Sequence, residues 1–364
     1  MPRRGPRPRP TRRPLIRRPL IRAALLTTVG LVALSACGGS EAGPRLELTA
    51  ALPDTPTDGT VLRVGDPATQ VALETSGLID GLDIEVEWAN ISGGPKTLEA
   101  FRADAIDIGS VADIPPLFAH WTGTDVRIVA ARETVDAEEH PTYELGVAPG
   151  VDVTSIEDLA GQKIAYSPGQ AQGALVLNVL REAGLSQEDV ELVEMQSVDD
   201  AFSVALASKQ VDVAPLGQTL VKTYLAKYEQ DGATTIAPGV RDDAWTLYTP
   251  TTVLEDADKA AAIKEYVGAW ARAQQWISEH PEEFAQAYYV EHEGLSPEDA
   301  AYIVDALGQF TVLTSWDEFI ERHQKTVDTL VEEQDQEPLD VETLYDRRYE
   351  KAIAAAVEKA VEGS

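Results

Sequence analysis

Two aspartates stand where a carboxylate could do chemistry. Asp66 follows a short alternating strand over residues 61–65, and Asp113 follows an apolar strand that ends in Gly109 and Ser110. Each aspartate also begins a helix, so its carboxylate could act in acid/base chemistry or accept hydrogen bonds from an ammonium or amino group. Either side chain could equally cap its own helix. The sequence leaves both roles open.

No catalytic or metal-binding pattern accompanies these acids. The five histidines are scattered, with none three or four residues from another, which excludes zinc-type spacing: His120, His140, His280, His292 and His323. No G-x-S-x-G motif occurs, and Cys37 is the only cysteine. We therefore expect a protein that is not an enzyme, with no cofactor and no bound metal.

Neutral hydrogen-bonding groups recur where loops open helices. Backbone N–H groups and the helix dipole at such places favour an anion by about 0.3–1 kcal/mol each. Trp245 could stack on a ligand or pack at a hinge. The predicted ligand-binding residues are Asp66, Gln70, Gly94, Ser110, Asp113, Ser167, Gln170, Gln218, Thr219 and Trp245. A pure anion would be repelled by the two carboxylates, whereas a zwitterion or an amino-substituted ring would not.

The elements that position these residues alternate between strand and helix. The stretch over residues 91–119 reads as helix, strand, ligand loop and helix, and a similar order returns over 143–243. This alternation predicts a doubly wound α/β arrangement. Further strands are predicted at 143–147 and 245–248. From residue 256 onward, aromatic residues at helical spacing predict a helical tail.

The first 36 residues predict an export signal. They contain nine arginines and no acid, and an apolar run over residues 23–36 precedes Cys37. The run is short for a membrane span. It ends in Leu34-Ser35-Ala36-Cys37-Gly38, which resembles a bacterial lipobox, so Cys37 is expected to carry lipid. An uncleaved anchor helix is the alternative. Arginine pairs such as Arg12-Arg13 resemble a twin-arginine signal, and the export route stays open.

Charge excludes one class of partner. Without the first 36 residues the chain keeps 21 basic and 61 acidic residues, a net charge of about −40. Nucleic-acid binding depends on neutralising phosphates with Lys and Arg, so we expect no nucleic-acid partner. So many acids indicate a solvated, soluble surface. Residues 38–59 are rich in Gly, Pro, Ser, Thr and acids with no apolar period, and we expect residues 37–59 to form a flexible tether.

Several motifs in order carry a family resemblance. LRVG, SGGPKTLEAFRADAIDIGSVADIPPLFA and TSIEDLAGQKIAYSPGQ resemble solute-binding proteins of ABC importers in the aliphatic sulfonate, taurine and nitrate group. The resemblance implies a type II periplasmic binding protein, with two lobes and a C-terminal helical tail. The strands at 143–147 and 245–248 would be the two that cross between the lobes. We expect residues 60–142 and 244–362 to form lobe 1 with its tail, and 143–243 to form lobe 2.

The resemblance also implies a function. We expect a monomeric, lipid-anchored protein on the extracytoplasmic face of the cell membrane, which captures a small organic anion or zwitterion between its lobes. Delivery to an ABC permease and its ATPase would follow. An aliphatic sulfonate or taurine is the expected solute. Nitrate, an aminopyrimidine that serves as a thiamine precursor, and a same-fold enzyme are the alternatives.

Overall fold

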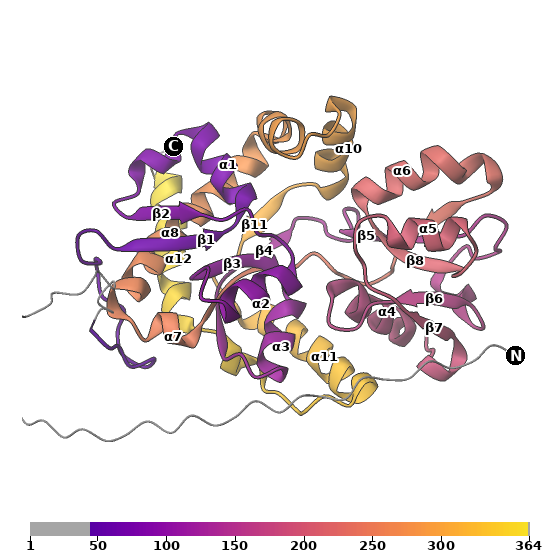
Figure 1. Ribbon diagram of the computed structural model, residues 1–364, viewed down its shortest axis with the longest axis horizontal. Helices are drawn as coiled ribbons and strands as arrows, with labels where there is room; N and C mark the ends of the chain where they lie inside the picture. The colour runs from indigo at the N-terminus through magenta and orange to yellow at the C-terminus, as the bar shows by residue number, and fades with distance from the viewer. Residues whose placement is uncertain (1–43, 363–364) are drawn as a thin grey trace, which may run out of the picture. The chain divides into compact units, whose positions relative to one another are not determined.

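The computed structural model describes residues 44–362. The predicted export signal at 1–36 and the predicted lipid-bearing Cys37 lie outside this range. Two separate β-sheets form, each with helices on its faces (Figure 1). We call each sheet with its helices a lobe. This is the two-lobed α/β architecture that the sequence predicts.

The first lobe contains a six-stranded mixed sheet with the order β11-β4-β10-β3-β1-β2. Its strands are β1 (Val61–Gly65), β2 (Glu85–Trp88), β3 (Ile108–Ala112), β4 (Val126–Thr134), β10 (Trp245–Pro250) and β11 (Phe310–Val312). Strand β1 is parallel to β2 and β3. Strand β10 lies antiparallel between β3 and β4, so a segment from far along the chain completes the middle of the sheet.

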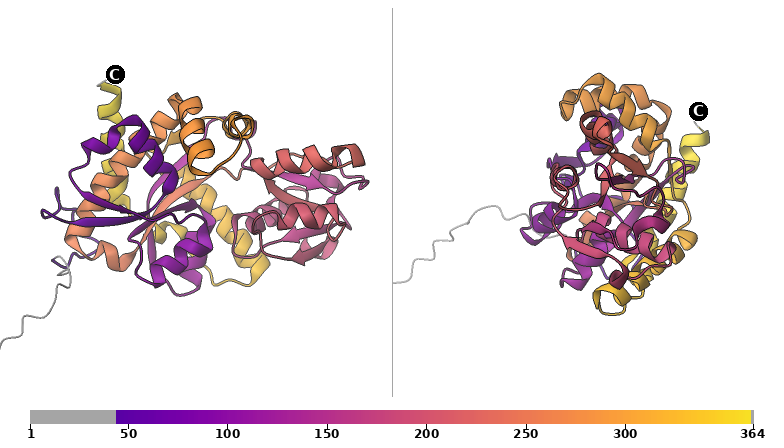
Figure 2. Two further views of the ribbon diagram at one scale, coloured as in Figure 1. Left: turned by 45° about the horizontal axis from the view of Figure 1, so that its top comes forward. Right: turned by 90° about the vertical axis from the view of Figure 1, so that its right-hand side faces the viewer.

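Helices cover both faces of this sheet, and the long helix α8 pairs with the C-terminal helix α12 beside it (Figures 1 and 2). Trp270, Tyr266 and Val267 of α8 are fully buried in the core. The helices are α1 (Pro67–Ser76), η1 (Leu78–Gly81), α2 (Gly94–Arg102), α3 (Ile114–Trp121), α7 (Thr251–Leu254), α8 (Ala257–Glu279), α9 (Pro281–Phe284), η5 (Ala285–His292), α10 (Pro297–Leu307), α11 (Asp317–Gln334), η6 (Val341–Leu344) and α12 (Arg347–Glu362).

The second lobe contains a five-stranded sheet with the order β7-β6-β8-β5-β9. Its strands are β5 (Tyr143–Val147), β6 (Lys163–Tyr166), β7 (Glu191–Glu194), β8 (Val213–Gly217) and β9 (Thr234–Ile236). Its helices are η2 (Ile156–Leu159), α4 (Ala171–Glu182), η3 (Gln187–Asp189), α5 (Ala201–Ala207), α6 (Gln218–Tyr228) and η4 (Glu229–Asp231). Strand alternation splits its core: Ala165 packs in a cluster with α5 and α6, while Ile164 packs in the cluster that includes α4.

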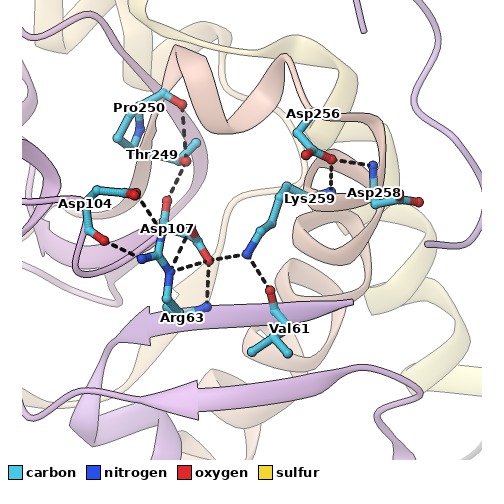
Figure 3. Close-up of polar contacts among 9 residues, drawn as sticks. All are labelled: Val61, Arg63, Asp104, Asp107, Thr249, Pro250, Asp256, Asp258 and Lys259. Carbon is cyan, nitrogen blue, oxygen red and sulfur yellow. Dashed lines mark hydrogen bonds and ion pairs between the residues drawn. The ribbon is translucent and has the colours of Figure 1, made fainter. Parts of the chain in front are cut away.

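A buried ion cluster fixes the amino end of β3 to its neighbours (Figure 3). Asp107 lies immediately before β3 and is 1% exposed. It forms ion pairs with Arg63 of β1 at 2.6 Å and with Lys259 of α8 at 2.7 Å, and Arg63 also reaches exposed Asp104 at 2.8 Å. Burial alone would raise the pKa of Asp107, but hydrogen bonds from Arg63 and Lys259 outweigh it and lower that pKa.

Residues 44–59 are held against the first lobe. The Thr57 backbone N–H and hydroxyl both donate to Asp258 at 2.8 Å, and Arg348 donates to the Ala50 carbonyl at 2.8 Å. The Leu46 N–H donates to the Glu255 carbonyl at 2.6 Å. Composition predicts a flexible tether over residues 37–59, but α7, α8 and α12 satisfy the polar groups of this part of it.

The chain passes between the sheets just before the two strands that were predicted to cross. Strands β5 and β10 are themselves sheet members, and the connections are residues 135–142 and 237–244. Asp242 binds these two connections together, because its carboxylate accepts from the Thr142 and Tyr143 N–H groups at 3.0 and 2.9 Å. Asp243 accepts from the Thr134 N–H at 2.8 Å.

Candidate functional site

A cavity of about 360 Å³ opens in the first lobe, at the carboxyl ends of β1 and β3. Loops beyond the carboxyl ends of strands are where open α/β sheets bind ligands. Its polar and charged lining residues are Asp66, Ser92, Ser110, Arg132 and Gln274. Its aromatic lining residues are Trp245, Phe284, Tyr288, Tyr289 and Phe310. The cavity thus offers one cation, one carboxylate and an aromatic wall.

Asp66 both caps a helix and faces the cavity. The carboxylate accepts a hydrogen bond from the Thr69 N–H at 3.2 Å, which starts α1, and a longer one from the Tyr266 hydroxyl at 3.4 Å. The side chain is 3% exposed. Burial raises the pKa of Asp66, and hydrogen bonds from Thr69 and Ser110 offset only part of that rise. The position of this carboxylate is therefore compatible with both of its expected roles, helix cap and ligand acceptor.

Arg132 is the cation of the cavity, and it is absent from the residues that the sequence predicts for the site. It lies in β4, where it pairs in register with Trp245 of β10. Its guanidinium lies 3.6 Å from the centre of the Phe310 ring, and its Nε atom is buried without a hydrogen-bond partner. Burial lowers the pKa of Arg132 to about 10, so the side chain stays charged at neutral pH. An arginine directly after the apolar run Ile128-Val129-Ala130-Ala131 was the available signal.

Trp245 and Ser110 are brought together as the sequence predicts for a shared site. The Trp245 indole N–H donates to the Ser110 hydroxyl at 2.7 Å, across the pairing of β10 with β3. Ser110 is 6% exposed and lines the cavity beside Asp66. The hydroxyl accepts from the indole, which leaves its own proton to donate towards Asp66.

The aromatic wall depends on an unusual helix. Residues of η5 form a π-helix that continues α9, and its wider turn brings residues four and five positions ahead of Phe284 onto one side. Phe284 and Tyr288 stack with ring centres 5.3 Å apart, and Tyr289 packs at 5.1 Å from Tyr288. The sequence predicts a helix here but not this geometry.

Asp113 lies outside the lining of this cavity. It accepts no capping hydrogen bond from α3, and its carboxylate is 3.9 Å from Nε2 of His323 in α11. Burial raises the pKa of Asp113 to about 7 and lowers the pKa of His323 to about 3. The two groups are therefore not a fully charged pair at neutral pH.

The other two first-lobe residues also lie outside the lining. Gln70 donates to Glu74 at 2.9 Å on the exposed side of α1. Gly94 allows α2 to begin against α3, because a Cβ atom there would lie 2.5 Å from the Pro115 ring. Its neighbours Ser92 and Gly93 do line the cavity.

The side chains of Ser167, Gln170 and Gln218 in the second lobe hydrogen-bond within the protein, and Thr219 does so through its backbone carbonyl. Ser167 and Gln170 hydrogen-bond to one another, and the Gln170 side chain accepts from the Ser197 N–H at 3.0 Å. Gln218 donates to the Pro141 carbonyl at 2.7 Å, and the Thr219 carbonyl accepts from Thr223 at 3.1 Å. None of these four residues lines the first-lobe cavity. Their part in ligand binding stays a prediction.

A larger cavity, of about 590 Å³, lies among α9, η5, α10 and the connection that follows β4. Its lining carries the acids Asp136, Glu282 and Asp305 and no lysine or arginine. An anion is therefore favoured by the Arg132 cavity and not by this one.

Two features are absent from residues 44–362. No group of three or more His, Cys, Asp or Glu side chains there could hold a metal ion. Within the same range, no helix has the length and apolar character needed to cross a membrane.

The chain belongs to the NMT1/THI5-like family, whose model matches residues 80–284, more than half of the chain. A putative aliphatic sulfonates-binding protein of Escherichia coli (strain K12) is 32% identical over 115 residues. That match covers 32% of this chain and 35% of the relative, so it spans about a third of the relative's length.

Solved structures show the fold. The periplasmic aliphatic sulphonate binding protein SsuA from Escherichia coli has a TM-score of 0.64 at 22% identity, covering 78% of this chain and 91% of that one. The alkanesulfonate-binding protein SsuA from Xanthomonas axonopodis pv. citri, bound to MOPS, has a TM-score of 0.63 at 20% identity, covering 81% and 99%. The fold is that of a type II periplasmic binding protein.

The same fold also carries an enzyme. DSZB, in a complex with biphenyl-2-sulfinic acid, has a TM-score of 0.57 at 15% identity, covering 82% of this chain and 99% of that one. Fold likeness alone therefore does not separate binding from catalysis, and the side chains of the site must do so.

Proposed function

We propose that this chain is the extracytoplasmic solute-binding component of an ABC importer and that it captures a small organic anion or zwitterion, an aliphatic sulfonate or taurine. The first-lobe cavity holds the solute, and the lobes deliver it to the permease. Lipid on Cys37 anchors the protein to the membrane. Family membership and the names of the relatives support the transport role.

The half-buried guanidinium of Arg132, whose Nε atom is fully buried, is the observation that carries the ligand class. Its Nε–H group faces no acceptor in the described chain, and a buried unpaired donor costs about 1–3 kcal/mol. A sulfonate oxygen would satisfy this donor with a charge-assisted hydrogen bond. The aromatic and aliphatic walls would cover the carbon chain of the solute.

An aminopyrimidine is the second candidate, and a specific observation favours it. Asp66 could accept from a ring amino group while the ring lies among Trp245, Tyr288 and Tyr289. Nitrate has no donor group for the Asp66 carboxylate and no carbon chain or ring to contact the aromatic wall. The enzyme alternative draws on fold likeness alone, and Cys37, the single cysteine, lies outside the described residues.

Thermal unfolding of the purified chain tests the ligand class. We expect taurine or an alkanesulfonate to raise the melting temperature, because a ligand that binds only the folded state stabilises it. Nitrate should leave the melting temperature unchanged. The Arg132→Gln variant should lose the sulfonate response, and Arg102→Gln, which removes an arginine on α2 outside the cavity, should keep it.

Two outcomes would redirect the proposal. Stabilisation by aminopyrimidines alone would replace the sulfonate assignment and keep the transport role. Turnover of a sulfinate or sulfonate by the purified chain would reject the binding-protein assignment.

Membrane anchoring has its own test. Cys37→Ser should release the protein from the cell envelope into the soluble extracytoplasmic fraction, because no lipid could be attached at that position. Retention of the variant in the membrane fraction would contradict the lipid anchor and indicate another means of attachment.

A further inference from the structure

The two charged groups of the cavity are each without an opposite charge in contact. Within residues 44–362, no ion pair joins Asp66 or Arg132 to any side chain within 4.0 Å, although Asp66 accepts hydrogen bonds from Thr69 and Tyr266. Arg132 lies over Phe310 and 5.6 Å from the centre of the Trp245 ring. The cavity therefore presents the half-buried cation of Arg132 and the buried carboxylate of Asp66, which form no ion pair with one another at contact distance.

This arrangement differs from the other buried acids with basic neighbours in the same lobe. Asp107 forms ion pairs with both Arg63 and Lys259, and Asp346 forms one with Arg348 at 2.5 Å. A buried charge usually needs such a partner. In the cavity, by contrast, the Asp66 carboxylate and the Arg132 guanidinium both line the space that an incoming molecule would enter.

Resting on the sulfonate-binding function proposed above, we propose that the cavity selects sulfonates that also carry an ammonium group, with the sulfonate on Arg132 and the ammonium on Asp66. Asp66 and Arg132 attract one another across the cavity without contact, and such a zwitterion would place an opposite charge in contact with each of them.

A simple alkanesulfonate would pair with only one of the two charged groups of the cavity. It would satisfy Arg132 but bring a second negative charge close to the buried Asp66 carboxylate, where repulsion is screened less than at the surface. An ammonium reverses the sign of that interaction. It also gains from the faces of Tyr288, Tyr289 and Trp245, because aromatic rings attract cations.

The size of the cavity limits the ligand further. A volume of about 360 Å³ lies near the lower end of ligand cavities, which run from roughly 300 to 1,000 Å³. A solute with a short chain between its two charged ends fits this space.

Ligands matched in size allow a test without any variant. Taurine, 2-hydroxyethanesulfonate and ethanesulfonate share the sulfonate and the two-carbon chain and differ only in the group that would face Asp66. We expect isothermal titration of the purified chain to show taurine binding at least about tenfold more tightly than the other two, since an ammonium–carboxylate contact is charge-assisted.

A variant then assigns that preference to Asp66. In Asp66→Asn, taurine should lose at least about tenfold in affinity while 2-hydroxyethanesulfonate binds as well as before or more tightly. Asp256→Asn is the matched control, because Asp256 also caps a helix, accepting from the Asp258 and Lys259 N–H groups of α8 away from the cavity. It should leave the order of the three ligands unchanged.

The pH dependence gives a second readout on the unmodified protein. Burial raises the pKa of Asp66, so acidification should protonate this carboxylate before an exposed one. Taurine affinity should therefore fall on mild acidification, and 2-hydroxyethanesulfonate affinity should hold or rise.

The outcomes separate this inference from the function it rests on. Equal binding of the three sulfonates, unchanged by Asp66→Asn, would overturn the inference and leave the sulfonate function standing. Binding of none of them would reject the sulfonate function itself. A preference for taurine that survives in Asp66→Asn would also overturn the inference, because another group would then recognise the ammonium.

Discussion

Buried aspartates at the two ends of the parallel strands β1 and β3 differ in their ion pairs and in the direction of their pKa shifts. At the amino end of β3, Asp107 forms ion pairs with Arg63 and Lys259, and its pKa is lowered. At the carboxyl end of β1, Asp66 has no ion pair within 4.0 Å among the described residues, and burial raises its pKa. The charges of the first cluster are paired within the protein, whereas in our proposal a ligand pairs the second. The difference distinguishes a stabilising cluster from a candidate binding site in one sheet.

Removing the Asp107 carboxylate from its ion cluster should have the largest effect on the free energy of unfolding. Asp107→Asn leaves Arg63 and Lys259 without their shared counter-charge, which for a buried ion pair costs about 3–5 kcal/mol. Urea unfolding measures this loss. The control is Asp104→Asn, which removes the second partner of Arg63. Because the Asp104 side chain is 89% exposed, this variant should change the free energy of unfolding by less than about 1 kcal/mol. Equal losses in the two variants would contradict the comparison.

Removing the charge of Arg132 in the first-lobe cavity should lower sulfonate affinity more than it changes the free energy of unfolding. Arg132→Gln should weaken sulfonate binding by about 10- to 100-fold, the value of a hydrogen bond to a charged group. The free energy of unfolding should hold or rise, because the variant no longer buries a charge whose Nε atom has no partner. Calorimetric titration and urea unfolding of the same sample give both quantities. A large loss of stability would place Arg132 with Asp107 as a structural residue.

The two aspartates should give the free energy of unfolding opposite pH slopes. The lowered pKa of Asp107 means that the unfolded state binds more protons, so its stabilisation is present above the unfolded pKa of about 3.9 and is lost as the pH falls. The raised pKa of Asp66 means that the folded state binds more protons, so stability falls as the pH rises above about 3.9.

Asp66→Asn isolates the second slope. The variant should become more stable relative to the unmodified protein as the pH rises from about 4 towards neutrality, because the amide has no proton to lose over that range. The measurement is urea unfolding of both proteins across these pH values, without ligand. A difference that does not depend on pH would show that Asp66 is not perturbed.

The smallest effect should come from the Trp245 indole. Trp245→Phe keeps an aromatic wall but removes the hydrogen bond to Ser110 at 2.7 Å. A neutral hydrogen bond contributes about 0.5–1.5 kcal/mol, so sulfonate affinity should fall by less than about tenfold. Titration calorimetry measures the change. A loss as large as that of Arg132→Gln would indicate that the indole itself holds the ligand.

Local patterns predicted much of the fold. Alternation identified β1 and β2, and Pro67 and Gly94 mark helix starts that α1 and α2 confirm. The sheet order was beyond local signals, because β10 enters between β3 and β4 from far along the chain. Residues 44–59 likewise have a loop-like composition and become ordered only through distant partners in α7, α8 and α12.

Sequence patterns predicted the cavity-lining residues that lie near a strand end. They did not predict the residues that only tertiary packing brings to the cavity. Asp66 was predicted because it follows a strand, and Ser110 because the apolar run was expected to end there, although β3 continues to Ala112. Arg132 was missed because it continues β4 past its apolar run, and only register with Trp245 brings it to the cavity. Tyr288 and Tyr289 face the cavity through a π-helical turn that no spacing rule predicts.

A position at a helix start was not enough to predict which aspartate lines the cavity. Asp113 has the same local setting as Asp66, yet α11 places His323 beside it from a distant part of the chain. Its carboxylate lies beside this histidine and outside the cavity lining.

A crystal structure of the protein grown with taurine tests the central claim most directly. We predict the sulfonate oxygens within hydrogen-bond distance of the Arg132 guanidinium and the ammonium within hydrogen-bond distance of an Asp66 oxygen, in the first-lobe cavity. Taurine bound instead between Ser167, Gln170 and Asp113, with Arg132 and Asp66 uncontacted, would contradict the account.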